Sequence, residues 1–190
     1  MKEQVQNQNL TDDELVEKIV KEKSTLCFAK LYDRYEHKVY NKCYGFAKTK
    51  AEAMDLTQEV FIKLFLKLHS FKGQSKFSTW LYAFTYNLCA NYVNRDKEHK
   101  ISKASRSIDD YTDILYIEVS DESLFQMRTD QLKKAMELIE PEDKAILLLK
   151  YQDDVSIKEL QLLLEIGESA VKMRLKRAKA RIIEAYNAVN

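Results

Sequence analysis

Three short segments of this chain carry the signature of a helix start, and this feature restricts the fold most strongly. Thr11, Thr49 and Ser156 are each followed three residues later by a glutamate. In such a capping box the hydroxyl accepts a hydrogen bond from a backbone N–H of the first turn, and the glutamate reaches back to the capping residue. The 190 residues include only three glycines and one proline, so few positions interrupt a helix. The sequence predicts an all-α fold.

Apolar residues recur at steps of three and four between these signals, which is the spacing of an amphipathic helix. We expect helices over about 12–23 and 25–48, one that begins after Thr49, others over about 79–97, 130–139 (capped by Asp130) and 141–151 (begun by Pro141), one that begins at Ser156, and a last one over 169–183. Gly73 marks a loop before the fourth of these helices.

The stretch from Ser107 to Met127 differs in composition from the rest of the chain. It contains no basic residue and six acids, which are Asp109, Asp110, Asp113, Glu118, Asp121 and Glu122. Such a segment forms a poor helix and a good linker. We therefore expect a flexible N-terminus over residues 1–10, a helical domain over 11–100, an acidic linker over 101–128 and a second helical domain over 129–190.

Other residue types exclude several classes of protein. Cys27, Cys43 and Cys89 lack the C-x-x-C spacing of a zinc or redox site, so we expect reduced, mostly buried thiols in a cytosolic protein, with no metal and no cofactor. No apolar run reaches about 18 residues, which argues against membrane insertion. No nucleophile paired with a base and no phosphate-binding glycine loop is evident, so we expect no catalysis.

The last predicted helix carries six Lys or Arg residues and no acid between Ser169 and Ile183. Its apolar stripe comprises Val171, Leu175, Ala178 and Ile182, and cations flank this stripe on both sides. The helix is expected to dock through the stripe and to present its cations to a polyanion. In the alternative interpretation these cations only extend along a packed helix surface.

Two blocks of sequence resemble one protein family. The first consists of Asp55–Phe65 (DLTQEVFIKLF), Phe77–Tyr82 (FSTWLY) and Asn87-Leu88, and it is similar to the second conserved region of extracytoplasmic-function sigma factors of bacterial RNA polymerase. The second consists of Leu138–Glu142 (LIEPE) and Val171–Ala178 (VKMRLKRA), and it resembles the fourth region of that family. The resemblance implies a region 2 helical bundle, a helix-turn-helix region 4, and a promoter-specificity subunit that binds core polymerase and directs transcription initiation.

The resemblance also assigns roles to residues. It implies that the polymerase clamp is bound by Asp55, Gln58, Glu59, Phe61 and Lys63. It implies that single-stranded −10 DNA is bound by Lys72, Lys76, Trp80, Asn87, Asn91 and Arg95, where aromatic faces and cations suit unstacked bases. Without the resemblance, the first set is an ordinary solvated helix face, and Trp80 has a competing role as a core aromatic.

Helix-turn-helix geometry sends the start of the second helix into the major groove of duplex −35 DNA. The side chains expected closest to base edges are Glu168, Ser169, Lys172, Met173 and Lys176. Those expected to contact phosphates are Arg174, Arg177, Lys179 and Arg181. The turn departs from the family pattern at Gln161, Glu165 and Gly167, because relatives often have a small residue, a glycine and a Ser or Thr there.

Three questions stay open at this level. A stand-alone helix-turn-helix regulator is the main alternative function, and a helical enzyme or scaffold is a more remote one. The acidic linker is either an inert tether or, as in the family, a segment that threads near the polymerase active site. Many relatives are held inactive by an anti-sigma factor, which is therefore a further expected partner.

Overall fold

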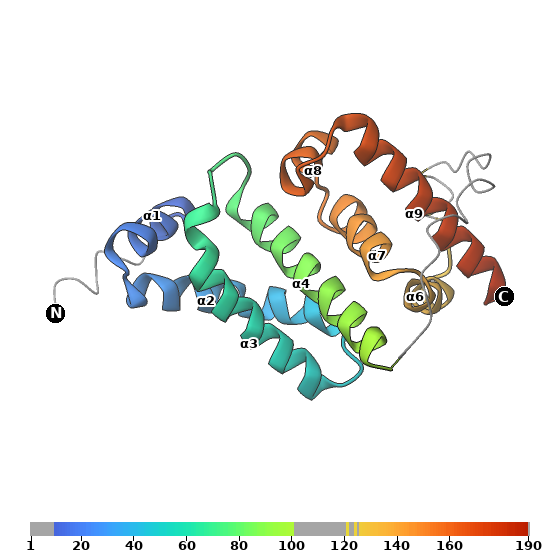
Figure 1. Cartoon of the computed structure of the whole chain (residues 1–190), viewed down its shortest axis with the longest axis horizontal. Helices are drawn as coiled ribbons and strands as arrows, with labels where there is room; N and C mark the ends of the chain where they lie inside the picture. Colours follow the sequence, from blue (N-terminus) through green and yellow to red (C-terminus); the bar gives the residue numbers. More distant parts are fainter. Residues whose placement is uncertain (1–9, 101–120, 122–123, 125, 190) are drawn as a thin grey trace. The chain divides into compact units, whose positions relative to one another are not determined.

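The computed structural model describes residues 10–100, 121, 124 and 126–189, and this part of the chain is helical without any strand (Figure 1). The all-α prediction is confirmed. Contacts within the chain gather into an N-terminal unit, residues 1–89, and a C-terminal unit, residues 90–190. The expected flexible residues 1–9 and most of the acidic linker lie outside the described residues.

The N-terminal unit is built from α1 (Asp12–Glu22), α2 (Thr25–Tyr44), α3 (Lys50–Lys67), the short 3-10 helix η1 (Leu68–Ser70) and the greater part of α4 (Phe77–Lys100). Helix α2 packs against both α1 and α3. The apolar faces of these helices meet in one core, whose fully buried side chains include Leu15, Leu31, Val39, Leu64 and Leu81. Burial of each such side chain stabilises the unit by about 1.5–3 kcal/mol.

The predicted helix starts agree closely with the structure. Thr11 and Ser156 both form complete capping boxes. Thr49 also caps its helix, since its hydroxyl accepts a hydrogen bond from the N–H of Glu52 at 3.1 Å. The carboxylate of Glu52, however, accepts from the N–H of Lys48 at 2.5 Å, one residue before the capping threonine.

Several predicted boundaries were wrong. Helix α2 ends at Tyr44 instead of residue 48, and the ring of Phe46 beyond it packs 6.0 Å from the ring of Tyr86. Helix α6 (Thr129–Leu138) has Arg128 as its N-cap, so Asp130 lies inside the first turn and does not cap. At the end of α2, the packing of Phe46 overrides the local pattern.

The loop between η1 and α4 contains Gly73, whose φ of +67° is in the left-handed region that favours glycine. The loop prediction at this position is therefore confirmed. Helix α4 then begins at Phe77, two residues before the predicted start, and the ring of Phe77 is buried against the rings of Phe71 and Trp80.

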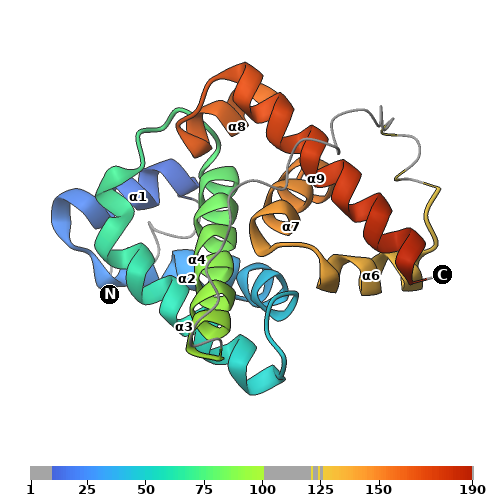
Figure 2. The same cartoon turned by 45° about the vertical axis from the view of Figure 1, so that its right-hand side comes forward.

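The C-terminal unit is organised around α9 (Glu168–Ala188), against which α6, α7 (Pro141–Leu147) and α8 (Ile157–Leu164) all pack. Figure 2 shows α8 turning back at the N-terminal end of α9, which forms the helix-turn-helix. The predicted helix over 141–151 changes its winding after Leu147, because Leu148–Gln152 form a π-helical turn, η3. The expected apolar stripe of α9 is confirmed, since Val171, Leu175, Ala178 and Ile182 are all buried.

All three cysteines are buried free thiols, as the sequence predicts. Among the described helices, none combines the length and the apolar character needed to cross a bilayer. Within the same residues, no cluster of His, Cys, Asp and Glu side chains is arranged to hold a metal ion.

Candidate protein-binding and nucleic-acid-binding surfaces

The first candidate surface lies along α3. Thr49 and the first turn fix where the helix begins, and a buried row that includes Ala53, Leu56 and Leu64 fixes which side faces the core. Asp55 and Gln58 are therefore exposed on the opposite side, at the three-residue spacing that places side chains on one face. Glu59 lies beside them and forms an ion pair with Lys63 at 2.5 Å.

Phe61 does not belong to this surface. Its side chain is only 3% exposed, and its ring lies 4.5 Å from the ring of Tyr32 and 6.5 Å from that of Phe28. Position 61 falls on the inner face of the helix, so a direct contact with a partner is excluded in this conformation. The prediction of Phe61 as a polymerase contact is corrected to a core position.

The same surface has apolar members that were not predicted from the sequence. Ile62 is 64% exposed and Leu66 is 66% exposed, and both continue the row of Asp55, Gln58 and Glu59 at helical spacing. Met54 and Phe65 are exposed on the same helix. The signal was present in the sequence, because the apolar residues of α3 are too many for a single buried stripe. We call Asp55, Gln58, Glu59, Ile62 and Leu66 the α3 face.

The second candidate surface is a row along α4 that starts at the loop after η1. Lys72 and Lys76 are exposed in this loop, and Asn87, Asn91 and Arg95 are exposed at steps of four along the helix. Trp80 lies in the same row of the helix, so the six residues predicted for single-stranded DNA follow one another along the loop and α4. We call these residues the α4 face.

Trp80 is partly in the core and partly exposed, so its surroundings are compatible with either of the roles that the sequence left open. Its indole is half-buried, with the ring of Phe71 at 5.4 Å and that of Phe77 at 6.0 Å. On the next turn, the ring of Phe84 stacks with it at 5.6 Å and an interplanar angle of 18°. One part of the indole therefore supports the loop, while the rest remains open to solvent as an aromatic platform.

The third candidate surface is α9 itself. The buried stripe fixes the rotation of this helix, so Ser169, Lys172 and Met173 are exposed and Lys176 is half-buried. These four side chains point away from the core stripe, on the N-terminal half of the helix. Glu168 forms an ion pair with Lys172 at 2.5 Å, and this hydrogen-bonded lysine lowers the pKa of the glutamate.

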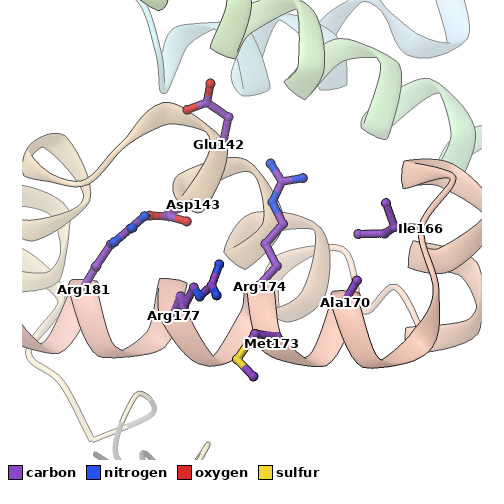
Figure 3. Close-up of a pocket in the computed structure, with 8 residues that line it drawn as sticks. All are labelled: Glu142, Asp143, Ile166, Ala170, Met173, Arg174, Arg177 and Arg181. Carbon is purple, nitrogen blue, oxygen red and sulfur yellow. The ribbon is translucent and has the colours of Figure 1, made fainter. Parts of the chain in front are cut away.

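The arginines of α9 lie on a different side of the helix, next to α7. Arg174, Arg177 and Arg181 line an open pocket of about 560 Å³ together with Glu142, Asp143, Ile166, Ala170 and Met173 (Figure 3). Figure 3 shows the guanidinium of Arg181 against the carboxylate of Asp143, while Arg174 extends between Glu142 and Ile166. Arg181 donates a hydrogen bond to Asp143 and forms an ion pair with it, and Asp143 is only 4% exposed.

Lys179 is also engaged, on the other side of the helix. Its ammonium lies 3.0 Å from Oδ1 of Asp121, and the hydroxyl of Tyr151 donates to the same oxygen at 2.6 Å. The hydrogen bond from Tyr151, followed by that from Lys179, lowers the pKa of Asp121. Burial and this carboxylate raise the pKa of Tyr151. One of the six linker acids is thus bound to the basic helix.

Among the cations between Ser169 and Ile183, Lys172, Lys179 and Arg181 are therefore paired with acids. No sequence signal identified Asp121 as the partner of Lys179 or Asp143 as the partner of Arg181, because the members of each pair are distant along the chain. The DNA-binding roles of the α9 residues stay predictions. The structure adds that some of these cations form ion pairs within the chain.

The turn between α8 and α9 explains the unusual residues noted in the sequence. Glu165 has φ of +54° as the C-cap of α8, so a glutamate occupies a left-handed position. Gly167 has φ of −67° as the N-cap of α9, a conformation that any residue adopts, and no side chain caps the helix there. The left-handed position that favours glycine is therefore residue 165, whereas the glycine of this turn lies two residues later, at position 167.

Comparison with known protein families gives two matches, in the order of the two units. Residues 31–99 match the family model described as Sigma-70 region 2, and residues 129–182 match the model described as Sigma-70, region 4. The two matched segments together cover more than half of the chain. The first contains the α4 face and the α3 face, and the second contains the helix-turn-helix.

Individual relatives match over nearly their whole length. The ECF RNA polymerase sigma factor SigW of Bacillus subtilis (strain 168) is 31% identical over 172 residues, which covers 85% of this chain and 90% of that protein. The ECF RNA polymerase sigma-E factor of Escherichia coli (strain K12) is 28% identical over 182 residues, which covers 93% of this chain and 94% of that protein.

Solved structures agree at the level of the fold. CnrH, in complex with the cytosolic domain of CnrY, superposes with a TM-score of 0.57 at 17% identity, covering 92% of this chain and 96% of that one. The sigma factor RpoE of Bartonella quintana, in complex with the anti-sigma factor NepR, gives a TM-score of 0.55 at 17% identity, covering 84% and 96%.

Proposed function

Because this chain belongs to the extracytoplasmic-function sigma factors of bacterial RNA polymerase, we propose how its three candidate surfaces divide the work of promoter recognition. The observation that carries the function is the match of both sigma regions, in order, over nearly the full length of a curated relative. The chain is a specificity subunit that acts with core polymerase and promoter DNA. It has no catalysis of its own in this proposal.

The α3 face binds core polymerase. Its centre combines carboxylates with exposed large apolar side chains, which is the mixture found where a buried interface has a charged rim. Ile62 and Leu66 supply the apolar area, while Asp55 and Glu59 are positioned to pair with cations of the partner. An exposed apolar row of this kind is unusual on a surface that meets only water.

The α4 face holds the separated −10 strand. Base stacking on an aromatic side chain contributes about 1–3 kcal/mol per base, and the neighbouring amides and cations follow the strand. The stacked pair of Trp80 and Phe84 supports this role because it presents a rigid aromatic platform. Lys72 and Lys76, both in the adjacent loop, supply phosphate contacts.

The N-terminal half of α9 reads the duplex −35 element. Ser169, Lys172, Met173 and Lys176 face away from the core and reach base edges in the major groove. Arg174 and Arg177 are the proposed phosphate contacts on the α7 side. Lys179 and Arg181 join them only when their bonds to Asp121 and Asp143 are given up.

An anti-sigma factor is a further proposed partner, since RpoE of Bartonella quintana was solved in complex with one. The polymerase and the promoter place the site of action in the cytoplasm.

The test is run-off transcription with purified core polymerase on fragmented genomic DNA, with and without this protein. We expect discrete new transcripts with the wild type. Asp55→Lys combined with Glu59→Lys should abolish both these transcripts and binding to core polymerase. Glu17→Lys is the matched control, because Glu17 forms a similar pair with Lys21 at 2.5 Å on α1, outside the α3 face.

A second comparison separates the two DNA surfaces. Trp80→Ala should reduce strand opening, measured by permanganate reactivity of promoter thymines, while core binding is retained. Lys172→Ala should weaken capture of the duplex without altering core binding. Specific duplex binding by the protein alone, with no binding to core polymerase, would instead establish a stand-alone regulator.

A further inference from the structure

Two cysteines from different helices meet in the core of the N-terminal unit. Cys43 lies near the end of α2 and Cys89 lies in α4, 46 residues further along the chain. Their sulfur atoms are 3.8 Å apart, and the thiol of Cys89 donates a hydrogen bond to the sulfur of Cys43. Both side chains are fully buried. The promoter-binding surfaces make no use of either residue.

The distance places the two sulfurs in direct contact without a covalent bond. A disulfide has an S–S distance of about 2.05 Å, so a small movement of the two side chains brings the atoms together. The hydrogen bond from Cys89, which is the largest contribution, lowers the pKa of Cys43 against the opposing effect of burial. The thiolate is the reactive form of cysteine, and this pairing assigns it to Cys43.

We propose that Cys43 and Cys89 form an oxidisable dithiol, a modification site for small two-electron oxidants of the peroxide class. The thiolate of Cys43 attacks one peroxide oxygen, the O–O bond breaks, and one water leaves after protonation. The sulfur of Cys89 then displaces the hydroxyl group of the sulfenic acid as a second water and loses its own proton. Overall, two S–H groups and one hydrogen peroxide give one S–S bond and two waters.

Burial of the two cysteines determines which oxidants reach them and how long the disulfide persists. With both thiols in the core, large oxidants have no access, and a small peroxide enters through local opening of the unit. A disulfide of this kind is transient in a reducing compartment, where thiol exchange restores the two cysteines.

The cross-link would join α2 to α4, and α4 carries the face proposed for the −10 strand. A bond between residues 43 and 89 closes a loop of 46 residues in the unfolded chain, so it stabilises the folded unit. The oxidised protein should therefore melt at a temperature higher by roughly 10 °C or more.

Cys27 provides an internal control. It is also a buried free thiol, but it lies 16 residues before Cys43 on the same helix, about 24 Å away along the axis. It cannot pair with either of the other two sulfurs while the unit is folded. A pairing that appears only after unfolding would be expected to include Cys27.

The experiment treats the full-length protein with hydrogen peroxide under native conditions, blocks remaining thiols with N-ethylmaleimide, and analyses the peptides by mass spectrometry. We expect loss of two hydrogens, a linked peptide that contains Cys43 and Cys89, reversal by dithiothreitol, and a raised melting temperature. Cys43→Ala and Cys89→Ala should lose the linked peptide and the temperature shift, whereas Cys27→Ala should keep both.

Two results would overturn the proposal. One is oxidation of Cys43 or Cys89 to sulfinic acid in the folded wild type without any linked peptide. The other is a cross-link that forms only in urea, with Cys27 among its partners. Both readings come from the wild type, so they stand even where an alanine variant fails to fold.

Discussion

The ion pair between Asp143 and Arg181 predicts that Arg181 of α9 stabilises the fold of the C-terminal unit. Arg181 was expected from sequence to contact a DNA phosphate, yet its guanidinium lies against a carboxylate that is only 4% exposed. Replacing Arg181 by alanine leaves this carboxylate without its partner in the interior. The Arg181→Ala variant should therefore lose stability, and the loss should be centred on α7 and α9.

The magnitude follows from the burial of the two groups. Two unit charges 4 Å apart attract by about 4 kcal/mol at an effective dielectric constant of 20, and breaking a buried pair typically costs about 3–5 kcal/mol. The Arg181 side chain is 21% exposed, so solvent screens part of the interaction. We expect the free energy of unfolding to fall by about 2–3 kcal/mol, somewhat less than for a fully buried pair.

Amide hydrogen exchange of the full-length protein measures this change locally. A loss of about 2–3 kcal/mol in opening free energy accelerates exchange by roughly 30- to 150-fold in the amides of α9, since about 1.4 kcal/mol corresponds to a factor of ten. Lys172→Ala is the matched control. Its side chain is 63% exposed, and its i,i+4 pair with Glu168 is at the surface, so exchange should change by about twofold or less.

The salt dependence of duplex binding by the holoenzyme completes the test. Each lost phosphate contact reduces the slope of log K against log salt by about 0.9 for duplex DNA. A variant with exchange rates like those of Lys172→Ala, together with a slope reduced by that amount, would refute the structural role of Arg181. It would identify this arginine as a phosphate contact instead.

Four further outcomes are expected. Glu165→Gly should raise the melting temperature of the C-terminal unit, because relief of a left-handed non-glycine residue contributes about 1 kcal/mol. Gly167→Ser should stabilise α9 by roughly a few tenths of a kcal/mol, measured by urea unfolding, since its φ of −67° and the open space around it accept a capping side chain. Ser156→Ala removes a capping box and should cost about 1 kcal/mol in the same assay. Folding lowers the pKa of Asp121, so its contact with Lys179 and Tyr151 stabilises the protein at pH values above the ordinary carboxyl pKa. This stabilisation is lost as the pH falls through the lower pKa of the folded state. An NMR titration of Tyr151 should show the corresponding change, and the Asp121→Asn variant should lack it.

Helix starts were predictable because their information is local. A cap and its glutamate are three residues apart, and the hydroxyls of Thr11 and Ser156 form the expected bonds. Helix ends were less predictable, since α2 stops at Tyr44 where Phe46 turns to meet a ring of α4. The π-helical turn after Leu147 has no local signature in the sequence either.

The candidate surfaces were also predictable only where the information is local in the sequence. Periodicity correctly identified the buried stripe of α9, and with it the side that faces away from the core. It did not reveal the partner of Arg181, which is 38 residues away, or the meeting of Cys43 with Cys89. Residues this far apart are brought together only by tertiary packing, and the spacing of residues within one helix does not predict such contacts. Phe61 was misplaced because a motif position was taken for an exposed one.

The α3 face has a consequence for how much of this protein a cell can hold. Ile62 and Leu66 expose large apolar area to water whenever the chain is unbound, and such patches favour self-association. A bound partner removes this liability, so copies made in excess of their binding sites are the ones exposed to aggregation and to proteases. If the α3 face binds core polymerase as proposed, the lifetime of the protein therefore depends on the ratio of its copies to the available partner.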